Sequence, residues 1–405
     1  MKIIVVILLV AFSWQLNAQE VNKKDSTSTE IKKPKRYNFV TARYHAGRVL
    51  ATNDFLKGEN ETGEPIDFYQ AINFAYGVQT DGSKEWHHIF NFPYYGVSIY
   101  TANFFNVDEL GTPTSIYGFM GFPFKRWKKS MWGYELGFGL TYNWEPYDAY
   151  TNPFNVVIGS YRTVYIDANL FYQYHLSPRW DIRGSFGFTH FSNGGTKKPN
   201  SGINLLSPAI ELSYSFKDRP LLVREQQAAY MQHYEVALQF GAGARNILYD
   251  NPNDPSDPNM PKGTADVMHS YFNFSGAILK QSTWRNKFGA GLDITYDETQ
   301  NVTVTNPEDG NQEPTVVFAD KLSKKMMLGV FGAYEFTIDR LSIASNIGIL
   351  VLRDKGTNAN PLLYQKFGLK YHFKNDLYAG LLVRAHNFSV AEVIEWNLGY
   401  RIKWH

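Results

Sequence analysis

The sequence predicts an all-β protein, a transmembrane antiparallel β-barrel of about sixteen strands in two eight-stranded halves. Apolar and polar residues alternate with a period of two from about residue 37 to the end of the chain. The connections between the expected strands alternate between short and long, which is typical of outer-membrane barrels. Aromatic residues make up 16% of the chain, a high share for a protein that lives in water.

The first 36 residues precede the strands and contain two segments. A short positive start is followed by an unbroken apolar run over residues 3–12, and Ala18 supplies the small residue of a cleavage site. This pattern predicts a secretory signal peptide over residues 1–18. The apolar run is too short for a membrane-spanning helix, which needs roughly 20 apolar residues. Residues 19–36 are polar and aperiodic, and we expect a flexible segment there.

The expected strands share the alternating pattern and are bounded by clusters of Gly, Pro, Asn and Asp. In the first half they cover residues 37–50, 66–80, 86–104, 114–124, 131–144, 162–175, 180–192 and 203–216. In the second half they cover residues 230–247, 265–282, 285–298, 324–338, 341–353, 362–373, 377–387 and 391–404. Each is long enough to cross a bilayer, which takes a strand of about 9–11 residues.

A connector over residues 217–229 divides the chain into halves at 37–216 and 230–405. It is unusually long for the side of the barrel that otherwise has short turns. Two tandem eight-stranded barrels and one barrel of about sixteen strands both fit this division. We slightly prefer the single closed barrel, because closure removes every strand edge at once.

The last strand shows which face is apolar. Its apolar residues share one parity: Ile394, Trp396, Leu398, Tyr400, Ile402 and Trp404. Its other parity is polar or small: Glu395, Asn397, Gly399, Arg401 and Lys403. An apolar exterior around a polar interior is the pattern of a barrel wall in lipid. A soluble barrel would place the apolar row inside.

Composition excludes several classes of function. The chain has 40 Lys and Arg against 38 Asp and Glu, a net charge of +2, which argues against a broad nucleic-acid-binding surface. It contains no Cys, which excludes disulfide scaffolds, thiolate metal sites and cysteine nucleophiles. We therefore expect no nucleic-acid partner, no metal site and no cofactor.

One segment, residues 180–204, combines residue types that can perform chemistry. His190 and Ser192 share the outward parity near the outer end of their strand, with Cα atoms about 6.5–7 Å apart. Asn204 is the polar residue near the head of the next strand that can reach His190. A Ser beside a His base that is oriented by a third group can attack an ester. Gly194 and Gly195 would let backbone N–H groups approach a developing oxyanion. The alternative is an ordinary polar rim with an Asn-Gly loop.

The same segment resembles a known family. The run Phe188-Thr189-His190-Phe191-Ser192-Asn193-Gly194-Gly195, then Pro199-Asn200-Ser201-Gly202-Ile203 and Glu211-Leu212-Ser213-Tyr214, is similar to the signature of the PagL-type lipid A 3-O-deacylases, also called acyloxyacyl hydrolases. The resemblance covers roughly residues 37–216. It implies an eight-stranded outer-membrane barrel that removes an ester-linked acyl chain from lipid A with a His/Ser/acid triad on its outer face.

The resemblance also implies roles for particular residues. His190 would be the general base and Ser192 the nucleophile, and Asn193 and Gly195 would line the oxyanion hole. The catalytic Glu of the family falls on Asn204, which is a departure, because an amide can orient a His but cannot balance the charge of an imidazolium. The extra half, residues 230–405, is a second departure.

The expected function is therefore that of a lipid A esterase in the outer membrane of a Gram-negative bacterium. Its partners would be lipid A or lipopolysaccharide and outer-membrane lipids, and a homodimer is one option for its assembly. The alternative is a non-catalytic barrel, a structural protein or channel that retains the motif. The second half contains a similar run, Ala385-His386-Asn387-Phe388-Ser389, but parity turns His386 inward, which argues against a second active site.

Overall fold

The computed structural model of the protein describes residues 36–248, 264–305, 315–354, 361–388 and 390–404. The predicted signal peptide lies outside the described residues, as does the predicted flexible segment except for Arg36. Among the described residues, no helix is both long and apolar enough to cross a membrane.

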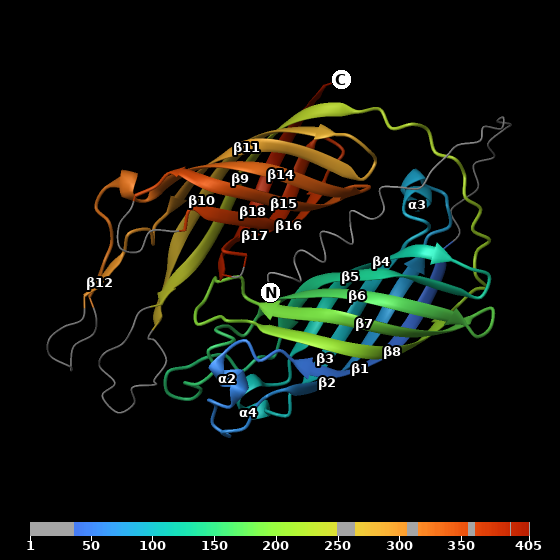
Figure 1. Ribbon diagram of the computed structural model, residues 1–405, viewed down its shortest axis with the longest axis horizontal. Coiled ribbons are helices and arrows are strands. Elements are labelled where there is room, and N and C mark those ends of the chain that lie inside the picture. Colours follow the sequence, from blue (N-terminus) through green and yellow to red (C-terminus); the bar gives the residue numbers. More distant parts are fainter. Residues whose placement is uncertain (1–35, 249–263, 306–314, 355–360, 389, 405) are drawn as a thin grey trace.

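The first barrel is built from eight antiparallel strands, each paired with its neighbours in sequence and closed by pairing of the first with the last. The strands are β1 (Tyr37–Val49), β2 (Phe68–Gln79), β3 (Tyr94–Asn103), β4 (Thr114–Arg126), β5 (Ser130–Tyr142), β6 (Thr163–His175), β7 (Trp180–Ser192) and β8 (Ile203–Ser215). Two short helices, α2 (Asp54–Lys57) and α4 (Val107–Leu110), lie at one end of this barrel, and α3 (Glu85–Ile89) lies at the other (Figure 1).

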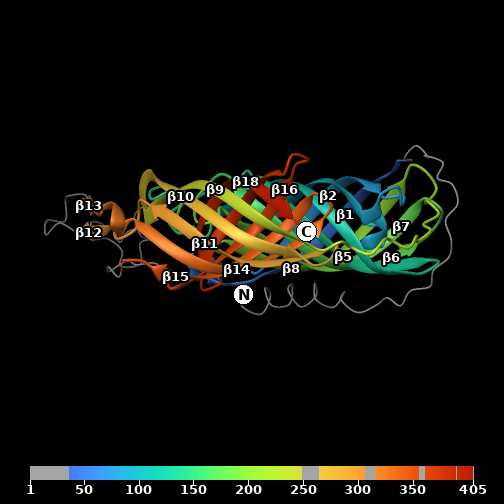
Figure 2. The ribbon, with the colours of Figure 1, turned by 90° about the horizontal axis from the view of Figure 1, so that it is seen from above.

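The second barrel also has eight strands and closes where β18 pairs with β9. The strands are β9 (His233–Leu248), β10 (Thr264–Gln281), β11 (Asn286–Asp297), β14 (Met326–Ile338), β15 (Leu341–Leu352), β16 (Leu363–His372), β17 (Leu377–His386) and β18 (Val390–Trp404). A small hairpin of β12 (Thr303–Thr305) and β13 (Thr315–Val317) projects beyond one end of it, and a 3-10 turn, η2 (Leu322–Lys324), follows (Figure 2).

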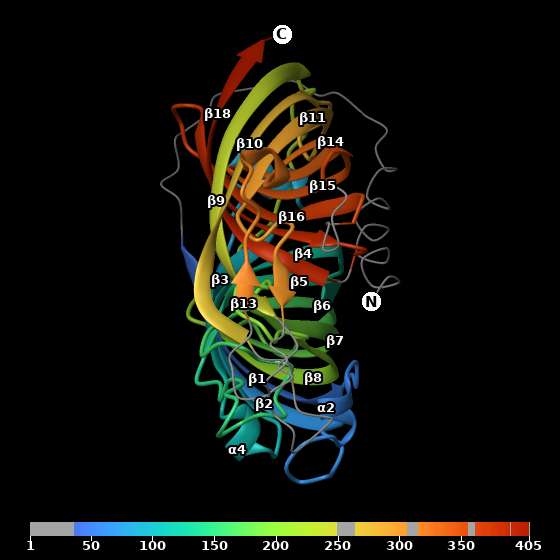
Figure 3. The ribbon, with the colours of Figure 1, turned by 90° about the vertical axis from the view of Figure 1, so that its left-hand side faces the viewer.

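The fold class is confirmed as all-β, with two eight-stranded antiparallel halves, but our preference for one large barrel is wrong. Each half closes on itself, and the two barrels lie next to each other (Figure 1, Figure 3). Closure removes the strand edges as completely in two small barrels as in one large barrel, so that argument does not choose between them. The pairing of β1 with β8 depends on partners far apart in sequence, such as Arg43 opposite Glu211.

One expected strand is partly wrong. We predicted a strand over residues 86–104, whereas residues 85–89 form the helix α3 and β3 begins only at Tyr94. Asn91 and Phe92, between them, adopt left-handed backbone conformations that end any regular strand. The mixture of aromatic and apolar residues at Trp86 to Phe92 has strand-like composition, and this composition misled the prediction.

The two faces of each wall carry different side chains. Apolar side chains such as Phe74, Val97, Ile278 and Trp396 point outward and are 60–69% exposed. Charged and polar side chains such as Arg43, Glu135, Asp293 and Glu395 point inward and are at most 5% exposed. This arrangement is unfavourable in water and favourable in lipid, and it confirms the parity read from the last strand.

The barrels contact each other near α3. Phe90 follows that helix and packs edge-on against Phe336 of β14, with ring centroids 5.7 Å apart. Phe122 and Ile338 complete a buried apolar cluster between the walls. The Arg285 guanidinium lies over the Phe90 ring and donates a hydrogen bond to the carbonyl of Ile89. This apolar contact joins the barrels at the end opposite to the β7–β8 loop.

Candidate functional site

The β7–β8 hairpin positions the residues singled out in the sequence. Pairing of the two strands sets His190 directly opposite Asn204, and Phe191 opposite Ile203. His190 shares the outward parity of Ile182 and Phe186, which are 36% and 56% exposed. The period of two then turns the neighbouring Phe191 inward, where it is completely buried.

His190 and Asn204 form a hydrogen bond. Nδ1 of the imidazole lies 2.7 Å from Oδ1 of Asn204, and Asn204 is only 3% exposed. Because an amide oxygen only accepts, this contact places the ring proton of neutral His190 on Nδ1. The lone pair of Nε2 is then the one with which His190 can take up a proton.

Ser192 is held at its oxygen by two donors. Its Oγ accepts a hydrogen bond from the Gly194 N–H at 3.0 Å and another from Asn200 Nδ2 at 2.9 Å. A hydroxyl has two acceptor lone pairs and one proton, so these bonds leave the proton to be donated elsewhere. In the described part of the chain no hydrogen bond joins Ser192 to His190. Both side chains lie against Gly202, where an added Cβ would come within 3.1 Å of His190 Cε1 and 3.5 Å of Ser192 Cβ.

The two residues expected in an oxyanion hole are engaged within the loop. The Asn193 N–H donates to Asn200 Oδ1 at 3.1 Å, and the Gly195 N–H donates to Asn193 Oδ1 at 3.0 Å. Both acceptors are side-chain amide oxygens. An oxyanion that binds at either N–H group must therefore take the place of an amide oxygen, a neutral acceptor that is weaker than an anion.

A neighbouring loop of the first barrel supports the same segment. Backbone N–H groups of Ser201 and Gly202 donate to the carbonyls of Val156 and Val157 at 3.1 and 3.0 Å. Asn193 Nδ2 also donates to Ser160 Oγ at 3.2 Å. The chain before β6 therefore fixes the loop that follows β7.

The interior of the first barrel is filled with paired charges. Arg43 binds Glu135 at 2.7 Å and Glu211 at 2.6 Å, and Arg183 binds Glu135 at 2.9 Å. These side chains are at most 5% exposed. Glu211 thus faces inward and has no access to His190.

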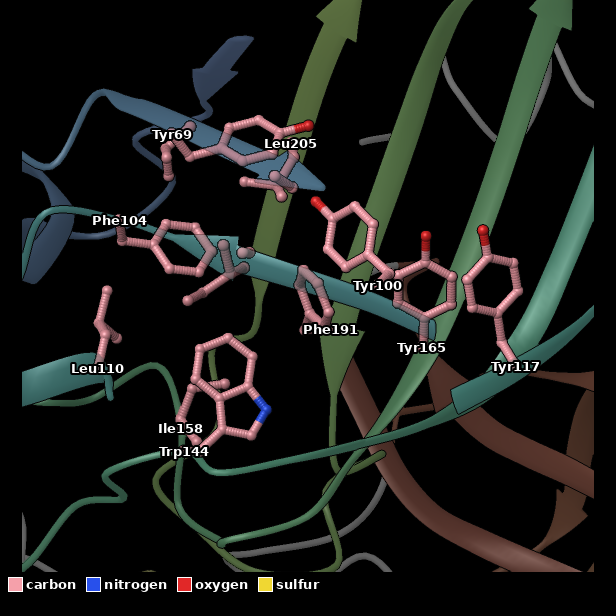
Figure 4. Close-up of a cluster of buried hydrophobic side chains, with 14 of the residues drawn as sticks. Tyr69, Tyr100, Phe104, Leu110, Tyr117, Trp144, Ile158, Tyr165, Phe191 and Leu205 are labelled. Atoms are coloured by element: carbon pink, nitrogen blue, oxygen red, sulfur yellow. The ribbon is translucent and has the colours of Figure 1, made fainter. Parts of the chain in front are cut away.

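Aromatic residues close the outer end of this barrel above the charges. The buried side chains of Tyr69, Phe104, Trp144 and Phe191 cluster across the strands (Figure 4). Phe104 stacks on Trp144, and the Trp144 and Phe191 rings meet edge to face at 5.2 Å. A channel needs an open polar lumen, so this packing argues against the channel alternative.

The second barrel is filled in the same way. Lys287 binds Glu235, Lys370 binds Glu335 and Arg384 binds Glu392, at distances of 2.7–2.9 Å. His386 lies at the inward parity of Arg384 and is half-buried, while Ser389 lies outside the described residues. Within the described ranges, no group of three or more His, Asp or Glu side chains could hold a metal ion.

A shallow apolar hollow of about 850 Å³ lies on the outer wall of the second barrel. The hollow forms where the side chains are small or absent, at Gly276, Ala290 and Gly332. Larger side chains such as Ile278 and Leu292 border it. None of the site residues expected from the sequence lines this hollow. It is therefore separate from the chemistry considered at His190 and Ser192.

Two contacting residues were given no role by the sequence analysis. Asn200 binds both Ser192 Oγ and the Asn193 N–H, yet in the sequence it is one Asn of a polar loop. Its place between Pro199 and the glycine at 202 was the available signal. Asn246 contacts the loop from the second barrel, and no local pattern could show that, because it lies 48 residues after its partner Lys198.

Family models match the chain in two consecutive stretches. Residues 70–217 match the model described as "Lipid A 3-O-deacylase (PagL)". Residues 232–404 match the model described as "Acyloxyacyl hydrolase, C-terminal domain". The two matches correspond to most of the first barrel and all strands of the second.

Other comparisons are weaker. No curated protein is significantly similar to the chain. Among solved structures, the toluene transporter TodX of Pseudomonas putida is 8% identical, with 91% of this chain and 88% of that chain covered and a TM-score of 0.18. The siderophore receptor PirA from Pseudomonas aeruginosa is 8% identical, with 92% and 82% covered and a TM-score of 0.24. These scores are too low to support a functional argument.

Proposed function

Because the chain belongs to the PagL-type family of lipid A 3-O-deacylases and acyloxyacyl hydrolases, we propose that it is an outer-membrane esterase that hydrolyses an ester-linked acyl chain of lipid A. The observation that carries this proposal is the hydrogen bond between His190 and Asn204. Ser192, whose hydroxyl would be the nucleophile, follows His190 by two residues on the same strand. A serine, a histidine and a group that orients the histidine are the parts that nucleophilic ester cleavage needs.

In the proposed reaction Ser192 Oγ attacks the ester carbonyl carbon, and His190 Nε2 takes the serine proton. The tetrahedral intermediate then collapses. The bond to the sugar oxygen breaks, and that oxygen receives the proton from His190. Water, deprotonated by the same histidine, then attacks the acyl-serine; the bond between Ser192 Oγ and the acyl carbon breaks, His190 returns the proton to Ser192 Oγ, and the fatty acid is released. No further reactant is required.

We propose that Asn193 and Gly195 stabilise the oxyanion through their backbone N–H groups. Both would exchange the amide oxygens that they bind at rest, Asn200 Oδ1 and Asn193 Oδ1, for the developing anion. Because a charged acceptor makes the stronger hydrogen bond, this exchange favours the transition state over the ground state.

The surrounding wall fits a substrate that lies in a membrane. Apolar side chains cover the outer face of β7 and β8, including Phe186, Ile210 and Leu212, which are 46–57% exposed. A lipid at this wall would present its ester near the outer strand end, where His190 and Ser192 lie. The expected signal peptide provides the export route to the outer membrane, and lipid A supplies the ester.

The test is the mass of lipid A from cells that express the protein. We expect wild type to remove one acyl chain and Ser192→Ala to remove none. Ser185→Ala is the matched control, because Ser185 is on the same strand and has the opposite parity. The lipid A of the host could lack the acyl chain that the enzyme removes. The activity of purified protein is therefore also measured on lipid A with different acylation patterns. Acyl chains retained in every wild-type experiment with folded protein would contradict the proposal.

A further inference from the structure

The segment after Ser192 also contacts the second barrel. Near the end of β9, the Asn246 N–H donates to the Thr196 carbonyl at 3.1 Å. The Asn246 side-chain Oδ1 accepts a hydrogen bond from the Lys198 N–H at 2.8 Å. Asn246 has the outward parity of Leu238 and Phe240, which are 40% and 51% exposed, but is itself only 2% exposed. The segment 193–198 therefore covers a polar residue on an otherwise apolar wall.

The glycine pair of this segment packs against β18. A Cβ on Gly194 would come within 2.4 Å of Ile394 Cγ1, and one on Gly195 within 2.5 Å of the Ala391 carbonyl oxygen. Both glycines have left-handed backbones, with φ of +64° and +81°. Glycine is thus required at both positions for two reasons: the left-handed backbone conformation and the close approach of the second barrel.

The Lys198 side chain lies close to charged groups of the second barrel. Burial lowers the pKa of Lys198, and Arg245 lowers it further, while Glu392 and Asp297 oppose this effect. Lys198 therefore interacts with the second barrel through its side chain as well as its backbone.

Two hydrogen bonds within the segment link the residues that contact Asn246 to Ser192. The Thr196 N–H donates to the Asn193 carbonyl at 3.3 Å, and the Gly194 N–H donates to Ser192 Oγ at 3.0 Å. A displacement at Thr196 or Lys198 would therefore move the amides that face the serine. The Phe90–Phe336 contact already joins the barrels at the opposite end, so Asn246 is not needed to hold them together.

We propose that Asn246 is a positioning residue of the esterase: it anchors the segment 193–198 so that its backbone N–H groups stay aligned with Ser192, which makes the second barrel part of the catalytic apparatus. This inference rests on the proposed function. It gives a chemical reason for the second eight-stranded unit, because the first barrel alone lacks the surface on which the segment rests.

The first test is kinetic and uses the full-length protein. Asn246→Ala removes the acceptor for the Lys198 N–H, and we expect kcat to fall roughly 10-fold or more with little change in KM. Asn246→Asp keeps an acceptor oxygen at the same place and should restore kcat. Asn346→Ala is the matched control, a buried asparagine of β15 that is 6% exposed. Equal losses in Asn246→Ala and Asn346→Ala, or a KM effect alone, would overturn the positioning role.

The second test does not depend on activity. The chain has no cysteine, so Lys197→Cys introduces one thiol between the two anchored residues. We expect a maleimide to label it roughly 10-fold faster when Asn246→Ala is added, and at the unchanged rate with Asn246→Asp or Asn346→Ala. Unchanged labelling in Asn246→Ala would overturn the inference. If Asn246→Ala speeds labelling but the protein with native Asn246 cleaves no lipid, the anchor would be preserved and the esterase rejected.

Discussion

His190 Nδ1 lies 2.7 Å from Oδ1 of Asn204, the residue directly opposite it in the β7–β8 pair. The family resemblance places a glutamate at this position. The amide fixes the same tautomer and orientation that a carboxylate would fix, but it adds no negative charge. In the proposed site, Asn204 therefore orients His190 but cannot balance the charge of the imidazolium.

We predict that Asn204→Asp raises kcat, by roughly 10-fold, and that Asn204→Leu lowers it by roughly 100-fold or more. Aspartate stabilises the imidazolium that forms as Ser192 attacks, whereas leucine leaves the ring without an acceptor. Rates on purified lipid A would measure both changes. Asn143→Asp, at an exposed loop position, is the control for the substitution itself. A lower kcat in Asn204→Asp would show that the amide is the better partner at this site.

The filled lumens lead to a prediction for planar bilayers. Below the aromatic layer that contains Trp144 and Phe191, the paired charges of Arg43 and Glu135 block the first barrel. We therefore expect no steady single-channel current, with a porin of known conductance as the positive control. Phe191→Ala should also stay closed, because the charged layer remains beneath it. Regular current steps in wild type would revive the channel alternative.

The charge network of the first barrel should be costly to break. Glu135 binds both Arg43 and Arg183, all three with side chains at most 5% exposed. Glu135→Gln leaves two buried arginines facing the single carboxylate of Glu211, so one positive charge is uncompensated, and we expect a loss of about 3–5 kcal/mol in the free energy of unfolding. Urea unfolding in detergent micelles would measure it.

Two further variants test the cause of that loss. The double variant Glu135→Gln with Arg183→Met restores neutrality and should recover part of the stability. The outward-facing Val97→Ala should change it by no more than about 0.5 kcal/mol. If Glu135→Gln lowers the free energy of unfolding no more than Val97→Ala does, the buried ion pairs do not stabilise the barrel as we expect.

The sequence predicts the strands well because the pattern is local. A residue such as Trp396 points outward and its neighbour Glu395 inward, so parity can be read from adjacent residues. The same parity leads from His190 to Asn204 across one hairpin. It cannot show that β8 pairs with β1 rather than with β9, because closure depends on strands more than 150 residues apart. Asn246 escapes for the same reason, since its contact joins two barrels.

The final prediction concerns α3, which lies outside the strands. His87 Nδ1 accepts a hydrogen bond from the Gly82 N–H at 3.2 Å, and the side chain is only 6% exposed. The pKa of His87 is lowered to about 4, mainly by burial; Asp81 opposes this shift, and Lys84 and His88 add to it. The ring is thus neutral in the folded segment, while an opened segment titrates at the ordinary value of about 6.5.

Between pH 6.5 and 4 the opened segment binds a proton that the folded one does not bind, so folding weakens as the pH falls. The loss has an upper bound of ~3 kcal/mol. We expect hydrogen-exchange protection of residues 82–92, relative to intrinsic rates, to fall between pH 7.5 and 5, while β5 stays constant as an internal control. His87→Asn keeps an acceptor near Nδ1 and removes the titration, so its protection should not change with pH. Equal pH dependence in this variant and wild type would exclude His87 as the cause, since no imidazole remains at that position to titrate.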